Sequence, residues 1–326
     1  MALHTRLTQR LGIEHPVLCA PMGFVTGGKL AAAVTAAGGL GLIGGGYGDA
    51  EWLEREFAAA GNGRVGCGFI TWSLAKQPQL LQQTLAHAPA ALMLSFGAPE
   101  PFAAAVKAAG VCLICQVQTM AHTRAAVASG ADIIVAQGSE AGGHGQSRTT
   151  FTLVPEIADY LAKAAPETVL VAAGGVADGR GLAAALMLGA EGVLVGSRFM
   201  MSEEALVPAG LHEAVVRASG DATIRTTVLD VVRKLEWPPE HTGRALRNRF
   251  VDTWHGRERE LGAPDTVVRE FDRYTRARET GDMDNTGIFV GEAAGLLNDV
   301  RPAGDIVHDM VAQAERILTN RRALPR

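Results

Sequence analysis

One histidine of this chain lies in a glycine-rich loop that directly follows an apolar run. The run covers residues 132–136, and the loop extends from Gln137 to Gly145 with His144 near its end. Glycines let backbone N–H groups approach a planar or phosphorylated ligand, and the imidazole ordinarily titrates near neutrality. The loop is therefore a candidate for acid–base chemistry beside a bound ligand. A lone loop histidine is more often only a hydrogen-bonded structural residue, so its role depends on the surrounding elements.

Two other glycine-rich segments are typical of phosphate binding. The first is residues 171–181, which contains Gly174 and Gly175; the second is residues 195–198, which contains Gly196 and Ser197. Backbone N–H groups in such loops, and at the start of the helix that follows, bind phosphate. In the simpler interpretation the glycines form only a tight turn and Asp178 only caps the next helix. Because both segments follow neighbouring apolar runs, we favour phosphate binding.

The elements that must position these residues alternate along the first two hundred residues. Eight short apolar runs are separated by alanine-rich helical stretches: 16–20, 39–44, 65–70, 91–96, 111–117, 132–137, 168–173 and 192–196. Continuous apolar strands alternating with helices indicate a parallel sheet covered on both faces. Eight such units close a (β/α)8 barrel, whose active site is built from the loops after the strands. We therefore predict an α/β fold, a TIM barrel; an open doubly wound sheet is the alternative, and the order of its strands cannot be read from sequence.

The alternation ends near residue 202 and a different composition begins. Residues 203–285 are rich in charge and contain a stop at Trp237-Pro238-Pro239, which predicts a helical insertion or lid domain. We therefore divide the chain into a barrel over 1–202, a helical lid over 203–285, and a C-terminal segment over 286–326 that returns to the barrel. Periodicity over 306–318 predicts that this segment ends in a helix covering the barrel.

Three patterns imitate functional motifs. Residues 39–44 read G-x-G-x-x-G, but they form an apolar strand themselves instead of the turn after a strand, so we reject a dinucleotide site. Cys112 and Cys115 lie three apart on a predicted strand and should face opposite sides as core thiols. His122 and His241 have no zinc-type spacing, so we expect surface or helix-end positions and no metal site.

Composition excludes several classes of protein. The formal net charge is −4, which gives no basic field for nucleic acid or an anionic membrane. No stretch of about 18 apolar residues could span a bilayer, and no apolar leader begins the chain. Four cysteines are too few for a disulfide framework. We expect a cytoplasmic protein.

Taken together, the motifs resemble those of the nitronate monooxygenase family, formerly the 2-nitropropane dioxygenases. The marks are Ala20-Pro21-Met22 after the first strand, the run from Gln137 to His144 after the sixth, and the glycine-rich segments after the seventh and eighth. The likeness covers nearly the whole chain. Flavin-dependent enoyl-acyl carrier protein reductases share much of it.

The resemblance implies an FMN cofactor and assigns residues to it. His144 matches the active-site histidine, and Gly143 would let the backbone pass close to the flavin. The implied cofactor site consists of Ala20, Pro21 and Met22 along the isoalloxazine ring, Gln116 and Gln137 at ring or ribityl polar atoms, and Ala173, Gly174, Gly175, Gly196 and Ser197 toward the phosphate. Some relatives carry lysine where this chain has Gln116, so a neutral hydrogen bond replaces a cation here and the flavin potential should be lower.

The activity that the resemblance implies is oxidation of alkyl nitronates, or of nitroalkanes, by FMN and O2 to a carbonyl compound and nitrite. His144 would act either as an imidazolium that stabilises the anion or as a neutral base that removes the α-proton, and these roles need opposite protonation states. Two alternatives stay open: an NAD(P)H-dependent FMN reductase of quinones or enoyl thioesters, and a non-catalytic FMN-binding protein. The expected partners are a small-molecule nitronate or nitroalkane and O2, with a homodimer as an open possibility and no nucleic acid or membrane.

Overall fold

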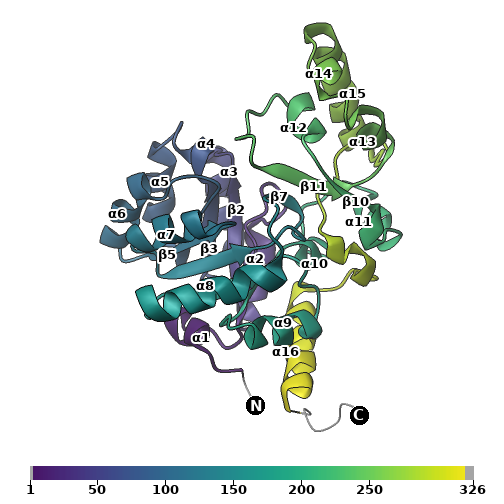
Figure 1. The fold of residues 1–326 in the computed structure, drawn as a ribbon. Coiled ribbons are helices and arrows are strands. Elements are labelled where there is room, and N and C mark those ends of the chain that lie inside the picture. The colour runs from purple at the N-terminus through teal and green to yellow at the C-terminus, as the bar shows by residue number, and fades with distance from the viewer. Residues whose placement is uncertain (1–2, 320–326) are drawn as a thin grey trace.

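Eight parallel strands close a barrel in the computed structural model, which describes residues 3–319 (Figure 1). Each strand pairs with the next along the barrel, and the last returns to the first through the pair Val17 and Val193. The strands are β1 (Val17–Cys19), β2 (Leu40–Gly46), β3 (Gly66–Ile70), β4 (Ala91–Ser95), β5 (Cys112–Val117), β6 (Ile133–Gln137), β8 (Val169–Ala173) and β9 (Val193–Val195). Each of the eight predicted runs overlaps one of these strands. The barrel is confirmed and the open sheet is excluded.

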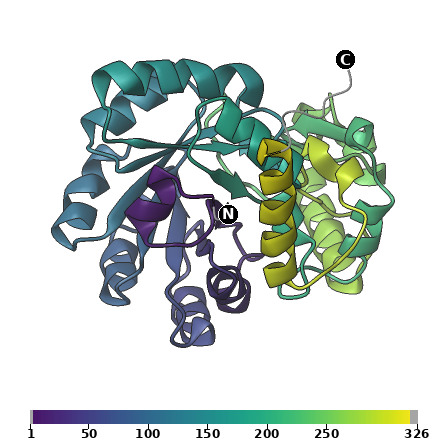
Figure 2. The same cartoon turned by 90° about the horizontal axis from the view of Figure 1, so that it is seen from below.

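Helices surround the barrel, as the view along its axis shows (Figure 2). Several of them begin at a side-chain cap: the Asp49 carboxylate accepts from the backbone N–H of Trp52, and Asp178 accepts from those of Arg180 and Gly181. The helices of this part are α1 (Arg6–Leu11), α2 (Gly28–Ala36), α3 (Ala50–Ala60), α4 (Thr71–Leu74), α5 (Gln79–Ala86), α6 (Glu100–Ala108), α7 (Met120–Ala128), α8 (Thr150–Ala164), α9 (Gly179–Met187) and the short α10 (Ser197–Met200).

The apolar side chains on the two sides of the barrel strands belong to separate clusters. One cluster lies between strands and helices and contains Cys115, while the other fills the barrel interior, with Cys112 packed against it. The two thiols therefore face opposite sides of β5, as predicted, and both are free. Burial raises the pKa of each to about 12, so both stay protonated and unreactive at neutral pH.

The insertion after the barrel contains strands as well as helices. Its helices are α11 (Leu211–Val216), α12 (Val228–Val232), α13 (Arg249–Trp254), α14 (Glu258–Leu261) and α15 (Pro264–Thr280), and its strands are β10 (Thr223–Thr226) and β11 (Thr242–Leu246). Both strands form an antiparallel sheet, in the order β10-β11-β7, with β7 (Gly143–Gly145) from the loop after β6. The predicted helical insertion thus also contains two strands that were not predicted, because short strands rich in threonine and arginine carry no apolar alternation and pair only with a distant partner.

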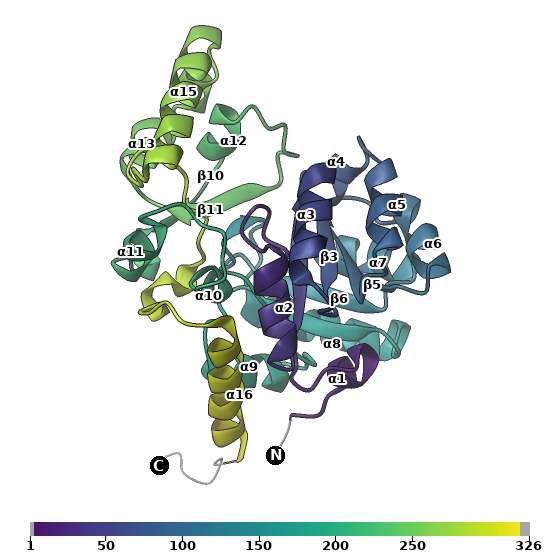
Figure 3. The same ribbon diagram turned by 180° about the vertical axis from the view of Figure 1, so that it is seen from behind.

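The chain returns to the barrel through its last helix, α16 (Ala303–Thr319), after the short turn η2 (Glu292–Leu296). The helix lies along α9 and also contacts α2, and it buries Ile306, Met310 and Ala314 (Figure 3). The predicted helical cover is confirmed. No helix within residues 3–319 combines the length and apolar character needed to cross a membrane.

The G-x-G-x-x-G pattern has a packing role in β2. A Cβ added at Gly41 would lie 2.1 Å from the backbone oxygen of Ala31, so the missing side chain lets α2 sit directly on the strand. The predicted strand is confirmed.

Substitution of this glycine should therefore loosen the barrel. We expect Gly41→Ala to lower the free energy of unfolding by about 3 kcal/mol, because backbone must move to admit the methyl group. Gly304→Ala is the matched control: its Cβ would lie 3.6 Å from the Ala37 methyl, and the stability should be unchanged or slightly higher. Urea unfolding of the two variants measures the difference, and equal midpoints would contradict the packing argument.

Candidate functional site

His144 lies on β7, where the barrel meets the insertion. Its backbone pairs with Gly243 of β11, and its side chain is only 8% exposed. Because β7 belongs to the loop after β6, the histidine lies at the carboxyl ends of the barrel strands, the end used for catalysis in this fold. The predicted position of the loop is thus confirmed. The strand β7 that carries the histidine forms only by pairing with β11 of the insertion.

Two arginines of the insertion fix the loop that carries His144. The backbone oxygen of Ser139 accepts from Arg225 Nη1 at 3.2 Å and from Arg244 Nε at 2.9 Å. Arg244 also forms an ion pair with Glu292 at 2.7 Å. Burial lowers the pKa of Arg225 to about 10, which still leaves it charged at neutral pH. The loop is therefore anchored by charge-assisted hydrogen bonds.

The imidazole of His144 is paired with a buried carboxylate. Its Nε2 lies 3.0 Å from Oδ1 and 2.9 Å from Oδ2 of Asp230, which belongs to α12 and is also buried. Arg233 Nη2 lies 2.9 Å from the same carboxylate and compensates its charge. A carboxylate can only accept, so Nε2 carries the proton and the lone pair of the neutral ring is on Nδ1. This pairing fixes both the tautomer and the orientation of the ring.

Burial decides the charge of His144. Desolvation lowers its pKa from the ordinary value of 6.5, against the hydrogen bond and negative charge of Asp230, which raise it; Arg233 and Arg225 lower it further. The imidazole is accordingly neutral at neutral pH. In this state Nδ1 can accept a proton.

Aromatic rings surround the histidine. The indole of Trp237 stacks on the imidazole with the ring centroids 3.5 Å apart and the planes 2° from parallel. Phe289 and Phe96 lie farther away, with centroid distances of 5.5 and 6.5 Å. Trp237 also donates from Nε1 to the hydroxyl of Tyr47 at 2.9 Å, joining the insertion to the loop after β2.

Three glutamines form a hydrogen-bonded row beneath His144. The Gln137 oxygen accepts from Gln116 at 3.1 Å and from Gln118 at 2.9 Å, and its nitrogen donates to the backbone oxygen of His144 at 3.1 Å. The side chains of Gln116 and Gln137, predicted for one cofactor, are thus brought into direct contact. Gln118 continues the row to His122, whose Nδ1 lies 3.2 Å from its oxygen.

His241 does not lie at the surface, so its predicted location was wrong. The side chain is 3% exposed, its ring centroid lies 5.3 Å from that of Phe96, and its Nδ1 has no hydrogen-bond partner among the described residues. Burial lowers its pKa to about 4. Its position beside β11 places it under the insertion, a contact that its spacing in the sequence does not reveal.

The loop after β1 lies at the same end of the barrel. The Ala20 backbone oxygen accepts from the backbone N–H of Met22 at 2.9 Å and from the Thr26 hydroxyl at 2.7 Å. A Cβ on Gly68 would lie 2.4 Å from the Pro21 ring, so the loop is packed onto β3. Ala20, Pro21 and Met22 thus form a fixed edge beside β2 and β3.

The loops after β8 and β9 provide donors suited to a phosphate. Gly174 and Gly175 have φ angles of 98° and 78°, a backbone region that favours glycine. The N–H groups of Gly175 and Val176 have no acceptor among the described residues. The Ser197 hydroxyl accepts from the N–H of Gly291 at 3.0 Å, which leaves its own proton to donate.

These backbone and hydroxyl donors would suit the phosphate of a bound cofactor. A Cβ on Gly196 would have Met22 Sδ at 3.6 Å and Ala20 Cβ at 3.7 Å as its nearest neighbours. The glycine-rich loops after β8 and β9, which we call the glycine cradle, therefore adjoin the loop after β1. A Cβ on Gly143 would meet nothing within 4 Å, which leaves open space beside the His144 loop. Asp178 caps α9, as expected if this residue has only a structural role. The predicted cofactor residues therefore share one end of the barrel.

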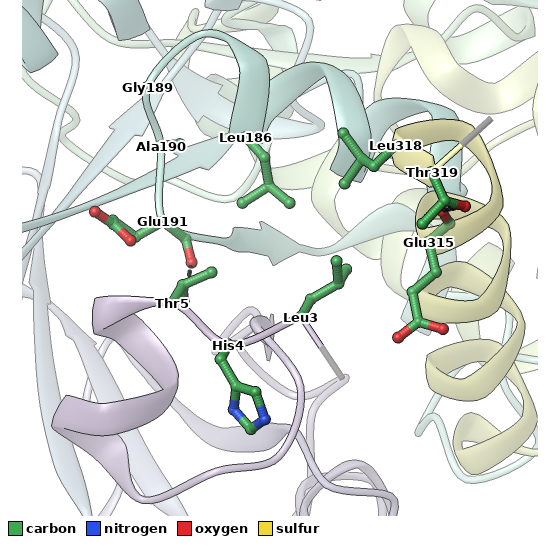
Figure 4. Close-up of a pocket in the computed structure, with 10 residues that line it drawn as sticks. All are labelled: Leu3, His4, Thr5, Leu186, Gly189, Ala190, Glu191, Glu315, Leu318 and Thr319. Atoms are coloured by element: carbon green, nitrogen blue, oxygen red, sulfur yellow. Dashed lines mark hydrogen bonds between the residues drawn. The ribbon is translucent and has the colours of Figure 1, made fainter. Parts of the chain in front are cut away.

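A separate cavity of about 540 Å³ lies at the opposite end of the barrel (Figure 4). Thr5 donates to the backbone oxygen of Glu191 at 2.6 Å there, and the wall is completed by residues of α9 and α16. It lies at the amino ends of the strands, the side that serves stability in this fold.

Sequence analysis did not identify five residues as part of the site: Asp230, Trp237, Tyr47, Arg225 and Arg244. Asp230 and Arg225 lie in charged stretches that resemble solvated helix faces, and nothing in their spacing points to residue 144. Of these residues only Trp237 could have been singled out from the sequence, because it is a tryptophan before two prolines in a chain with 5% aromatic residues.

Comparison with known proteins agrees with this geometry. The family model described as nitronate monooxygenase matches residues 4–62 and 72–313. A nitronate monooxygenase of Neurospora crassa is 34% identical, with 92% of this chain and 89% of the relative covered, and one of Metarhizium robertsii is 37% identical over 93% and 92%. Among solved structures, FabK from Thermotoga maritima has a TM-score of 0.84 at 30% identity, covering 98% of each chain.

Removing the charge of Asp230 should lower the pKa of His144 further. In Asp230→Asn the raising influence is lost while burial and the two arginines remain, so the imidazole should protonate only at lower pH. NMR titration of the histidine Cε1–H signals measures the change, with His144→Asn identifying the resonance. The control is Asp252→Asn, which removes a surface partner of Arg247 and should leave that titration unchanged. A rise in the pKa would contradict the arrangement.

Proposed function

This chain belongs to the nitronate monooxygenase family and is a flavin-dependent oxidoreductase, and we propose that it oxidises alkyl nitronates with FMN and O2 to a carbonyl compound and nitrite. The observation that carries the proposal is the buried pair of His144 and Asp230 at the carboxyl end of the barrel, beside the glycine cradle. The pair offers a neutral base of fixed tautomer within a site whose donors suit a phosphate.

The cofactor would be held by backbone and small side chains. Gly174, Gly175, Gly196 and Ser197 would bind its phosphate, Ala20, Pro21, Met22 and Ala173 would lie along it, and Gln116 and Gln137 would hydrogen-bond its polar atoms. When bound, FMN would supply the electron-accepting chemistry of the reaction, with O2 as the co-substrate. The amide of Gln116 brings no charge, so any stabilisation of negative charge there comes from dipoles only.

His144 would act as a base toward neutral nitroalkanes. With Nε2–H donating to Asp230, the Nδ1 lone pair can take the α-proton, and the carboxylate stabilises the imidazolium that results. The lowered pKa of His144 favours the role of a base over that of an imidazolium that stabilises an anion, because the ring is neutral when substrate arrives. Toward a nitronate, which has already lost that proton, the same ring would only donate or accept a hydrogen bond.

Loss of His144 should therefore separate the two substrate forms. We expect His144→Asn to reduce kcat/KM for a neutral nitroalkane by about 10²–10⁴ fold and for the matching nitronate much less. In the native enzyme the nitroalkane rate should rise with pH through a pKa below 6.5, since the neutral base is the active form. His87→Asn, far from the site and stacked on Phe57, is the control. Undiminished turnover of both forms would exclude His144 from catalysis.

Cofactor binding can be tested at Gly196. A Cβ there meets only ordinary contacts, so Gly196→Val should leave the barrel folded while its branches enter the cradle. We expect at least tenfold weaker FMN binding, measured by flavin fluorescence during titration of the flavin-free protein. The unfolding temperature without flavin should equal that of the native chain; equal FMN affinity would place the phosphate elsewhere.

A second candidate function is reduction of FMN by NADH or NADPH, with a quinone or an enoyl thioester as acceptor. The similarity to FabK over 98% of the chain favours it. Anaerobic mixing with NADPH decides between the two, because rapid bleaching of the yellow chromophore is expected of the reductase and not of the monooxygenase.

The first experiment is the visible spectrum of the purified protein, followed by propionate 3-nitronate and NADPH added separately. A yellow protein that turns over neither would be a flavin-binding protein without catalysis.

A further inference from the structure

Trp237 covers the histidine that the proposed function requires. Its indole lies flat on the imidazole with the centroids 3.5 Å apart, so one whole face of His144 is closed to any planar ligand. The opposing Nε2 edge is taken by Asp230. A substrate that binds against that face must therefore displace the indole.

The indole is fastened at its far edge by one hydrogen bond to the barrel. Its Nε1 donates to the Tyr47 hydroxyl at 2.9 Å, and edge-to-face contacts with Phe96 and Trp72 have centroid distances of 5.1 and 5.5 Å. Four aromatic side chains from the insertion and from the loops after β2, β3 and β4 thus meet in one cluster. Trp237 itself is only partly buried, and it belongs to the 233–241 connection, which has no regular secondary structure. Side-chain movement there does not require the barrel to unfold.

We propose that Trp237, latched by Tyr47, is the specificity-determining residue of this site and that it selects nitronates with a flat apolar substituent. The inference rests on the proposed role of His144. Once the indole has moved, a planar aryl group can stack on it and on the neighbouring rings, whereas a short alkyl group cannot. Moving the indole costs the same for both substrates, so the stacking on the indole that only the aryl group gains sets the preference.

The kinetic test compares phenylnitromethane and nitroethane, both presented as nitronates, on the holoenzyme. Trp237→Ala should lower the kcat/KM of phenylnitromethane relative to that of nitroethane by roughly tenfold or more, because it removes the ring on which the aryl group stacks. Tyr47→Phe deletes only the hydroxyl and should raise kcat/KM for both nitronates by about two- to tenfold without changing their ratio. Trp254→Phe, on α13 with its ring beside Arg257, is the control for a tryptophan substitution and should leave both values unchanged.

A binding measurement tests the role of Trp237 independently of the reaction. Benzoate, an inert planar aryl carboxylate, should perturb the flavin absorption spectrum of the native holoenzyme and of Trp254→Phe with the same affinity, and should bind to Trp237→Ala at least tenfold more weakly. An unchanged kinetic ratio in Trp237→Ala, or an undiminished benzoate affinity in that variant, would overturn the proposal. If the native enzyme turns over no nitronate while the benzoate response depends on Trp237, the proposed function fails and the latch stands.

Discussion

The pairing of β7 with β11 is the constraint on which the functional end of this protein depends. It ties the loop after the sixth barrel strand to a segment about a hundred residues later, and it sets His144 opposite Gly243. Arg225 and Arg244 strengthen the pairing because both donate to the one backbone oxygen of Ser139. Without the insertion the glycine-rich loop would lose its strand partner and both arginine donors, and the His144 ring would lose the carboxylate that orients it.

The same arrangement explains the electrostatics of the site. Asp230 reaches His144 from α12, so the residue that orients the ring and the residue proposed as the base come from different parts of the chain. Burial lowers the pKa of the imidazole and the carboxylate opposes that effect, and the ring stays neutral with a defined tautomer. Arg233 compensates the buried carboxylate, which would otherwise be costly to enclose. The insertion therefore tunes the barrel's base as well as covering it.

The barrel itself could be read from the sequence with few errors. Buried parallel strands must be continuously apolar, and eight such runs separated by helices leave little freedom in topology. The same logic placed Gly174, Gly175, Gly196 and Ser197 at one end, because loops after parallel strands share an edge. Short-range geometry also sufficed for Cys112 and Cys115, whose opposite faces follow from the alternation of a strand.

The sequence by itself thus determined the barrel, the glycine cradle and the position of the His144 loop, since each follows from periodicity within a few dozen residues. Only the tertiary structure decided what surrounds the histidine. The strands β10 and β11 are too short and polar to show a pattern, and Asp230, Trp237 and His241 reach the site through contacts that span about ninety residues or more. Charged and aromatic residues in a lid look like a solvated surface until the chain folds back on the barrel, because their burial is created by that contact alone.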